Sequence, residues 1–269
     1  MRIYCPTFLI LNVSKLTKTT LMNLSSNELF HFTEFEYLKL ILESKAFYPR
    51  YNLEFTHLSE SYRHRATLLP VAMVCFCDIP FEFSNQHRKR YGNHGICLTE
   101  KWKLSKSLNP IMYVQSESFL ANIFASFASM TPEFIPIIQN KNYGIEVPLT
   151  LAKVGHNLTY ITLFLKQFEN KKETLVEYAG KSRVFEKRRF YDEREWRYIP
   201  FEADNKDELI IDISDFDNAK KLEEFHERLK KYKLTFDFED INYLIVENKK
   251  EKLELEKLTE NKIKIVIAE

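Results

Sequence analysis

The strongest constraint on the fold is the irregular order in which strand-like and helix-like segments follow one another. Leu29–Thr33 predicts a short strand, and the next segment, up to Ser44, predicts a helix because its apolar residues recur at helical spacing. Thr33 and Glu36 predict a capping box at the start of that helix. Further strands are expected at 46–54, 71–79, 91–98, 190–200, 208–213, 241–247 and 262–268, and helices at 117–130, 158–169, 217–232 and 250–258. This irregular order predicts an α+β fold, with a mixed sheet and flanking helices.

The chain is long and apolar enough to build one sizeable core. Of its 269 residues 45% are hydrophobic, and 22 Phe and 14 Tyr exclude a disordered chain. The regular spacing of apolar residues starts just after Met22. Residues 1–21 are therefore interpreted as an N-terminal extension or a misassigned start, and 22–269 as a single domain. The run Phe8–Leu11 is too short for a signal-peptide core, and we expect no membrane span.

Motifs and charge exclude several classes of function. With 5 Gly, the chain holds no glycine-rich phosphate loop, no G-x-S-x-G elbow and no His-Glu-x-x-His helix. A net charge of +1 gives no overall attraction to nucleic acid or to an anionic membrane. Four Cys make no disulfide framework and indicate a reducing, cytoplasmic location.

A cysteine and histidine cluster offers one metal hypothesis. Its members are Cys75, Cys77, His87, His94 and Cys97. The spacing of the first two is shorter than structural zinc sites prefer, and Phe76 and Ile79 around them favour a buried core strand. The sequence therefore predicts no metal site.

Five sequence blocks in a fixed order carry a family resemblance. They read LFHFTEFEYLKLILES, MVCFCDIP, HRKRYGNHGICLTEKW, NPIMYV and FYDEREWRYIP, between Leu29 and Pro200. They resemble the successive blocks of the AbiGi family of abortive-infection proteins. The resemblance implies a role in phage resistance, as the antitoxin-like half of a two-gene system whose partner looks like a nucleotidyltransferase.

A second resemblance is to ADP-ribosyltransferases of the DarT and PARP-like kind. His31 and Thr33 in a strand, a leucine-rich helix after them and Glu195 in a later strand follow the order of that family. The resemblance implies an ADP-ribosyltransferase-like fold, NAD as substrate, a nucleic acid or protein as acceptor, and Glu195 and His31 as catalytic residues. It further implies a cofactor-binding set of Thr33, Tyr48, Arg50, Tyr51, Asp78, Tyr91 and Arg197.

The chemistry assigns roles to these residues. His31 is expected to hydrogen-bond the ribose, while Tyr48 or Tyr51 stacks on nicotinamide. Arg50 suits a phosphate, since a guanidinium matches its geometry. Glu195 would polarise the ribose hydroxyl or the acceptor in a transition state that resembles an oxocarbenium ion.

Strand periodicity supports the role of Glu195 but leaves alternatives open. Glu193, Glu195 and Arg197 share one strand face opposite Trp196, so we expect the Glu and Arg face to look onto solvent or a cleft. The same residues also fit ordinary cross-strand ion pairs. Thr33 also fits a helix cap, and His31 a satisfied core residue.

Two basic runs, His87–Tyr91 and Lys181–Arg189, fit either phosphate contacts or solvated faces.

The two resemblances leave two functions open: an NAD-dependent ADP-ribosyltransferase-like effector, or a non-catalytic antitoxin-like partner of a nucleotidyltransferase-type toxin. A sensor that binds phage nucleic acid through the second run is a lesser third.

Overall fold

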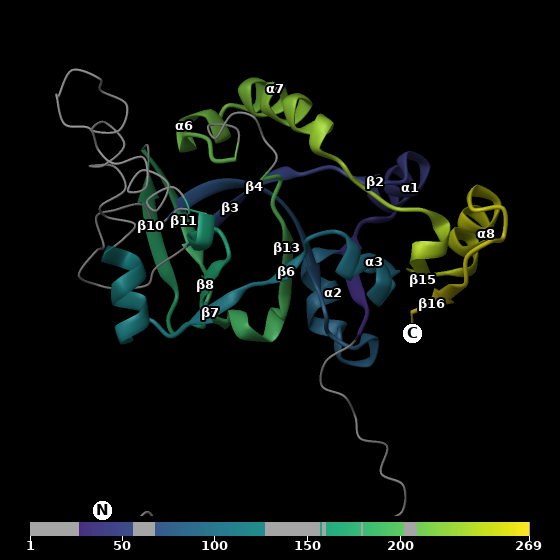
Figure 1. Ribbon diagram of the computed structural model, residues 1–269, viewed down its shortest axis with the longest axis horizontal. Helices are drawn as coiled ribbons and strands as arrows, with labels where there is room; N and C mark the ends of the chain where they lie inside the picture. The colour runs from purple at the N-terminus through teal and green to yellow at the C-terminus, as the bar shows by residue number, and fades with distance from the viewer. Residues whose placement is uncertain are drawn as a thin grey trace, which may run out of the picture.

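The structure is a computed structural model that describes residues 27–55, 68–126, 157, 160–178, 180–201 and 209–268. Its centre is an eight-stranded sheet in the order β16-β15-β5-β1-β4-β13-β6, with β3 also paired to β4 (Figure 1). The strands are β1 (Leu29–Thr33), β3 (Arg50–Phe55), β4 (Leu68–Cys77), β5 (His94–Leu98), β6 (Asn109–Pro110), β13 (Glu195–Tyr198), β15 (Ile241–Val246) and β16 (Ile265–Ile267). Only β15 and β16 in this sheet run parallel, so the predicted mixed sheet and α+β class are confirmed.

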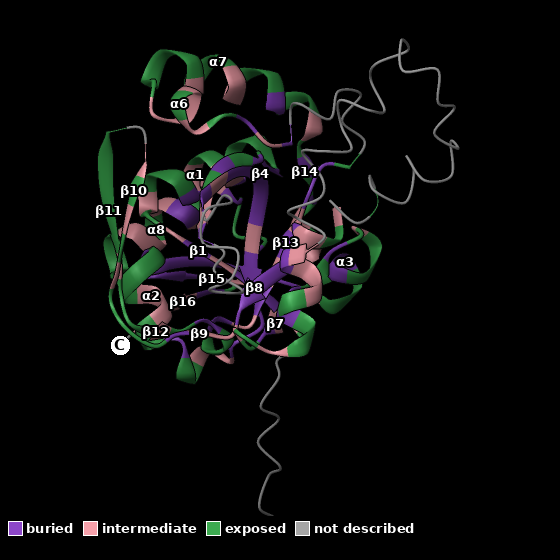
Figure 2. Ribbon diagram, turned by 90° about the vertical axis from the view of Figure 1, so that its left-hand side faces the viewer, coloured by how far each residue is buried: buried purple, intermediate pink, exposed green. Residues whose placement is uncertain are grey.

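Helices α1 (Phe35–Ser44), α3 (Glu100–Ser105) and α8 (Lys249–Leu258) supply apolar side chains to the largest core cluster. Leu38 and Leu42 point from α1 into this cluster, where Phe47, Phe76 and Trp102 pack with ring centroids 5.1–6.0 Å apart. The central strands are buried and the outer helices expose one side (Figure 2). Burial of these large apolar groups is the main stabilisation of this side of the sheet.

Smaller elements surround the sheet. Helices α6 (Ile213–Phe216) and α7 (Ala219–Leu229) lie over β3 and β4, where Tyr51 packs against Phe225 (Figure 1). Further helices and turns include α2 (Asn85–Tyr91) and 3-10 turns at Phe81–Phe83, Phe190–Glu193, Lys230–Tyr232 and Phe238–Asp240. The short strands pair as β2 (Ala46–Phe47) with β14 (Leu234–Thr235), β7 (Met112–Val114) with β8 (Leu165–Gln167), β9 (Glu169–Asn170) with β12 (Arg188–Arg189), and β10 (Thr174–Tyr178) with β11 (Lys181–Phe185).

Several local predictions are wrong. The helix after β1 has Glu34 as its N-cap without a side-chain cap, because Thr33 remains paired with His94 in the sheet. The expected strand at 91–98 begins only at His94, after the end of α2. The expected strand at 190–200 starts as a 3-10 turn, and the one at 208–213 is reduced to a single bridge between Val71 and Ile210.

The predictions for the less regular segments have mixed outcomes. The expected helix at 158–169 ends by 162 and becomes β8. The expected helix at 117–130 is helical at 119–126, and the rest lies outside the described residues. The predicted extension, residues 1–21, also lies outside them. In the part of the chain that the structure describes, no helix is long and apolar enough to cross a membrane.

Candidate functional site

The candidate site lies on one face of β4 and β13. The register pairs Glu195 with Cys77 and Arg197 with Cys75, so these four side chains share a face, while Trp196 and its partner lie on the other. The 3-10 turn before β13 ends at Arg194, whose left-handed backbone (φ 45°) redirects the chain into the strand. The turn thereby brings the side chain of Glu193 to the same place.

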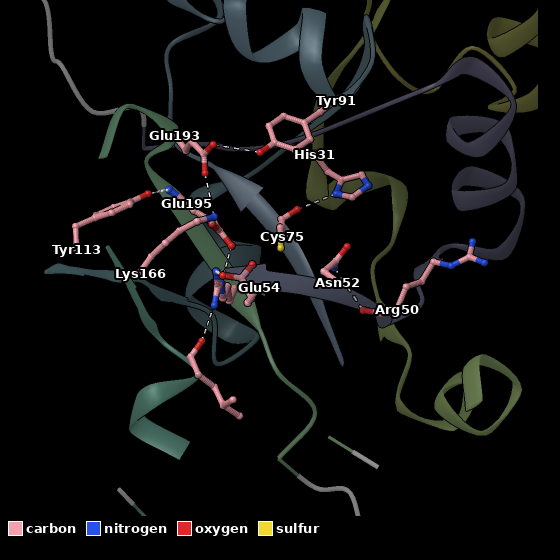
Figure 3. Close-up of polar contacts among 12 residues, drawn as sticks. His31, Arg50, Asn52, Glu54, Cys75, Tyr91, Tyr113, Lys166, Glu193 and Glu195 are labelled. Carbon is pink, nitrogen blue, oxygen red and sulfur yellow. Dashed lines mark hydrogen bonds and ion pairs between the residues drawn. The ribbon is translucent and has the colours of Figure 1, made fainter. Parts of the chain in front are cut away.

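The carboxylate of Glu195 is held by two cations. Lys166 on β8 donates to Oε2 at 2.8 Å, and Arg197 donates through Nε to Oε1 at 2.6 Å (Figure 3). Lys166 also donates to Oε2 of Glu193 at 3.1 Å. Bulk solvent does not surround these ion pairs, because all four side chains are buried: Lys166, Glu193, Glu195 and Arg197.

Arg197 connects β13 to two further segments. One terminal nitrogen of its guanidinium donates to Oε2 of Glu54 on β3 at 2.7 Å, and the other donates to the carbonyl of Leu163 at 2.7 Å. With the Nε bond to Glu195, all three nitrogens are engaged. Buried guanidinium groups need this full set of partners because each unpaired N–H costs free energy.

Tyrosines and a further arginine complete the network. The hydroxyl of Tyr91, at the end of α2, donates to Oε1 of Glu193 at 3.2 Å (Figure 3). Arg188 donates to that hydroxyl at 3.1 Å and also ion-pairs with Glu193. On the other side, the hydroxyl of Tyr113 accepts a hydrogen bond from the backbone N–H of Glu195 at 2.9 Å.

The charges of this network reinforce one another. Burial alone would raise the pKa of Glu195, but Arg197 and Lys166 hold this pKa well below its ordinary range. Burial would lower the pKa of Lys166, and Glu195 and Glu54 instead raise it above its ordinary value. Glu195 and Lys166 are therefore both ionised at neutral pH, and they form a buried, compensated pair of charges.

Comparison with known proteins gives a family. A family model described as "Putative abortive phage resistance protein AbiGi, antitoxin" matches residues 45–247. The chain belongs to the AbiGi family. A relative named "Abortive phage resistance protein AbiGi", from Lactococcus lactis subsp. cremoris, is 29% identical over 220 residues, which cover 76% of this chain and 83% of that protein. No solved structure matches the chain, so the ADP-ribosyltransferase-like fold stays a prediction.

The AbiGi match spans the whole buried network. Glu54, Lys166 and Arg197 all lie inside residues 45–247, whereas β1 and α1, with His31 and Thr33, precede that segment. The AbiGi match therefore leaves out part of the segment that resembles an ADP-ribosyltransferase, namely the strand with His31 and Thr33.

Only three of the residues predicted for the site meet in this network. Glu195 and Arg197 contact each other directly, and Tyr91 is connected to Glu195 through Glu193 and Lys166. The expectation that the Glu and Arg face looks onto solvent or a cleft is wrong, since Glu195 and Arg197 are buried. The physical reason is that β8 lies over this face and supplies Lys166 as a counter-charge.

His31 does not join Glu195. Phe30, its neighbour, pairs with Cys77, so the side chain of His31 belongs to the opposite face, where its ring packs against Phe47 and Phe76 at 5.0 and 5.6 Å. Its Nδ1 lies 2.9 Å from the carbonyl oxygen of Cys75. Burial lowers the pKa of His31 against the opposing effect of that hydrogen bond, so the ring is neutral at pH 7.

The other predicted residues lie elsewhere. Tyr51 is buried and stacks on His226 of α7, and Arg50 beside it is exposed. Tyr48 is exposed in the turn before β3, and Thr33 ends β1 opposite His94. Asp78 accepts hydrogen bonds from Arg194 at 2.7 Å and from the indole of Trp196 at 3.3 Å.

The network has four further members that the sequence patterns did not indicate: Lys166, Glu54, Arg188 and Tyr113. One signal was present: Lys166 is a lone charge in the apolar run Leu163–Phe168. A lysine there needs a buried partner, because an isolated ammonium is expensive to bury. Within the described residues, the cluster links β3, β8 and β13.

Proposed function

We propose that this chain is the antitoxin-type component of an abortive phage resistance system, a binding protein that restrains a nucleotidyltransferase-type toxin. The observation that carries the proposal is the state of Glu195. Both of its carboxylate oxygens are bound by cations of the same chain, and the side chain is buried. The description of the matching family model as an antitoxin supports the same function.

A catalytic carboxylate must come within hydrogen-bond reach of its substrate. Here Lys166 and Arg197 occupy the positions that a ribose hydroxyl would take around Glu195. Opening the site would separate two buried ion pairs and leave uncompensated charges inside the protein, which costs several kcal/mol. A structural role, as a link among three strands, requires no such opening.

The hairpin of β10 and β11 provides a surface for the partner. Phe185 on one of its faces stacks on Phe55 of β3, with ring centroids 4.3 Å apart. On the opposite face Leu175 and Val184 are cross-strand neighbours, and they are 59% and 51% exposed. The hairpin lies at the edge of the molecule, away from β15 and β16 (Figure 1). An exposed apolar pair on such a ribbon is a suitable contact for another protein.

Growth measurements test the proposal. The protein encoded next to this chain should arrest growth when expressed alone, and co-expression of the chain should restore growth. Leu175→Asp should weaken this rescue at least about tenfold, because a buried interfacial charge without a partner opposes binding. Leu253→Asp on α8 is the matched control, since Leu253 is also 59% exposed. A neighbouring protein that is harmless, or toxicity that the chain does not relieve, contradicts the proposal.

The second candidate function is NAD-dependent ADP-ribosyl transfer, and one observation favours it. Groups with shifted pKa values gather around Glu195: burial raises the pKa of Tyr91 and of Tyr113, and Glu195 itself stays ionised. Such clusters are enriched at catalytic sites. In this alternative, NAD would displace Lys166 from Glu195 before reacting.

Calorimetry separates the two candidates. Under the antitoxin proposal, wild-type protein gives no saturable heat with NAD up to millimolar concentration. Saturable binding that is lost in Glu195→Gln, while far-ultraviolet circular dichroism shows an unchanged fold, would make the transferase the better function. Arg189→Gln is the control, because Arg189 is an exposed arginine whose ion pair with Asp192 lies at the surface.

A further inference from the structure

A second cluster of polar side chains lies at the opposite end of the sheet from the β10–β11 hairpin. His94 begins β5, Glu247 directly follows β15, and Glu251 is in the first turn of α8. The antiparallel pairing of β5 and β15 brings the start of one strand beside the end of the other. One ligand atom from each of the three residues lies within 4.8 Å of the others.

The geometry of the cluster centres on one imidazole nitrogen. Nε2 of His94 lies 3.0 Å from Oε2 of Glu251 and 3.9 Å from Oε2 of Glu247. His94 is only 4% exposed, and its ring lies against Phe35 of α1 at 5.3 Å. The buried ring is therefore fixed in place with Nε2 directed at two carboxylates.

The two carboxylates of this cluster share one imidazole, that of His94, as their basic partner. Among the described residues, neither Glu247 nor Glu251 forms an ion pair with a lysine or arginine. Glu247 receives only the side-chain amide of Asn93, at 2.8 Å, and Glu251 receives the backbone N–H of Glu247, at 2.9 Å. This differs from the Glu195 network, where each carboxylate has a cationic partner. Two carboxylates that converge on one imidazole carry more negative charge than that imidazole can neutralise.

Helix capping explains only part of the arrangement. Asn248, the N-cap of α8, accepts from the N–H of Glu251 at 3.0 Å, and Glu251 accepts from the backbone N–H of Glu247, the residue before the N-cap. These bonds place the backbone of Glu247 beside Glu251, but they do not require a buried histidine to face both carboxylates. One imidazole and two carboxylates are instead a ligand set that suits a divalent transition metal.

We propose that His94, Glu247 and Glu251 bind one divalent transition-metal ion such as Zn²⁺. Ligand atoms around tetrahedral zinc, at bond lengths of about 2.0–2.2 Å, are about 3.3 Å apart. The 3.9 Å separation between Nε2 of His94 and Oε2 of Glu247 is longer than this, so the exposed side chain of Glu247 would turn towards the ion. The bound ion joins β5, β15 and α8, and water completes its coordination.

The surroundings of His94 set the expected affinity. Ligation through Nε2 places a proton on Nδ1, and in the part of the chain that the structure describes this buried Nδ1 has no hydrogen-bond partner. Metal-bound histidines without such a partner lose about 10–100-fold in affinity. We therefore expect a micromolar site.

Titration of tag-free protein with Zn²⁺, followed by calorimetry and by thermal unfolding, tests the site. We expect one ion per chain with a micromolar Kd, and a rise in Tm of about 5 °C at a hundredfold excess over Kd. Glu247→Gln keeps the contact with Asn93, and it should weaken binding at least tenfold, as should His94→Gln. Glu256→Gln changes a carboxylate on the same helix outside the cluster, and it should bind as wild type.

Three results would overturn the proposal. The first is the absence of Zn²⁺ binding at millimolar concentration. The second is binding that Glu247→Gln and His94→Gln both leave unchanged, which would locate the ion elsewhere. The third is an NMR titration in which His94 is an imidazolium at neutral pH and stays so when Zn²⁺ is added. A protonated Nε2 has no lone pair with which to bind the metal.

Discussion

Replacement of Arg197 by methionine is expected to lower the free energy of unfolding by about 3–5 kcal/mol. The guanidinium is 1% exposed and donates to Glu195, Glu54 and the carbonyl of Leu163. Methionine fills much of the volume but leaves two carboxylates short of a cation inside the protein. Urea unfolding at pH 7, followed by circular dichroism, measures the change.

Two further variants identify the cause. Arg189→Met breaks an ion pair whose side chains are more than half exposed and screened by solvent, so its free energy of unfolding should stay close to that of the wild type. Glu195→Leu added to Arg197→Met should recover part of the loss, because removal of both partners is cheaper than removal of one. A cost below about 1 kcal/mol for Arg197→Met alone would mean that water or another cation compensates the carboxylates.

Local patterns predicted the elements that local forces determine. The strand Leu29–Thr33 agrees residue for residue, and α1 ends at Ser44 as expected. The strand–helix–strand unit at the C-terminal end is confirmed as β15, α8 and a parallel β16. In each case the spacing of apolar residues alone distinguishes a helix from a strand.

The errors arise where distant contacts decide. The apolar run around Lys166 fits a buried helix and a buried strand equally well, and parallel pairing with β7 made it a strand. Alternation in β13 correctly separated Trp196 from Glu195, but periodicity cannot say which face is covered. The covering charge comes from Lys166, 29 residues away, and a second partner of the face, Glu54, is 143 residues from Arg197.

The candidate site was predictable only in part for the same reason. Glu195 and Arg197 were found because they alternate in one strand. Nothing in the sequence indicates that Phe30 rather than His31 faces them, since that depends on the single pairing of Phe30 with Cys77. A shift by one residue would exchange the two side chains between faces.

Replacement of Gly92 by alanine is expected to lower the free energy of unfolding by about 3–5 kcal/mol. Gly92 ends α2 with φ 124°, a conformation that side chains strongly disfavour. A Cβ there would lie 2.1 Å from the carbonyl oxygen of Thr33 and 2.8 Å from the backbone nitrogen of Glu34. This backbone belongs to the junction of a central strand and α1, so it cannot retreat without moving both. Urea unfolding against wild type measures the cost.

Gly180→Ala separates strain from collision. Gly180 also has a positive φ, of 74°, but nothing lies within 4 Å of the place that a Cβ would take there, so alanine should cost about 1–2 kcal/mol. The excess at Gly92 then measures the contact with the β1–α1 junction. That contact also fixes the end of α2, where Tyr91 turns towards Glu193, so Gly92→Ala should loosen the Glu195 network as well. Equal costs for the two alanine variants would mean that backbone conformation alone, and not the close approach to Thr33, requires glycine at position 92.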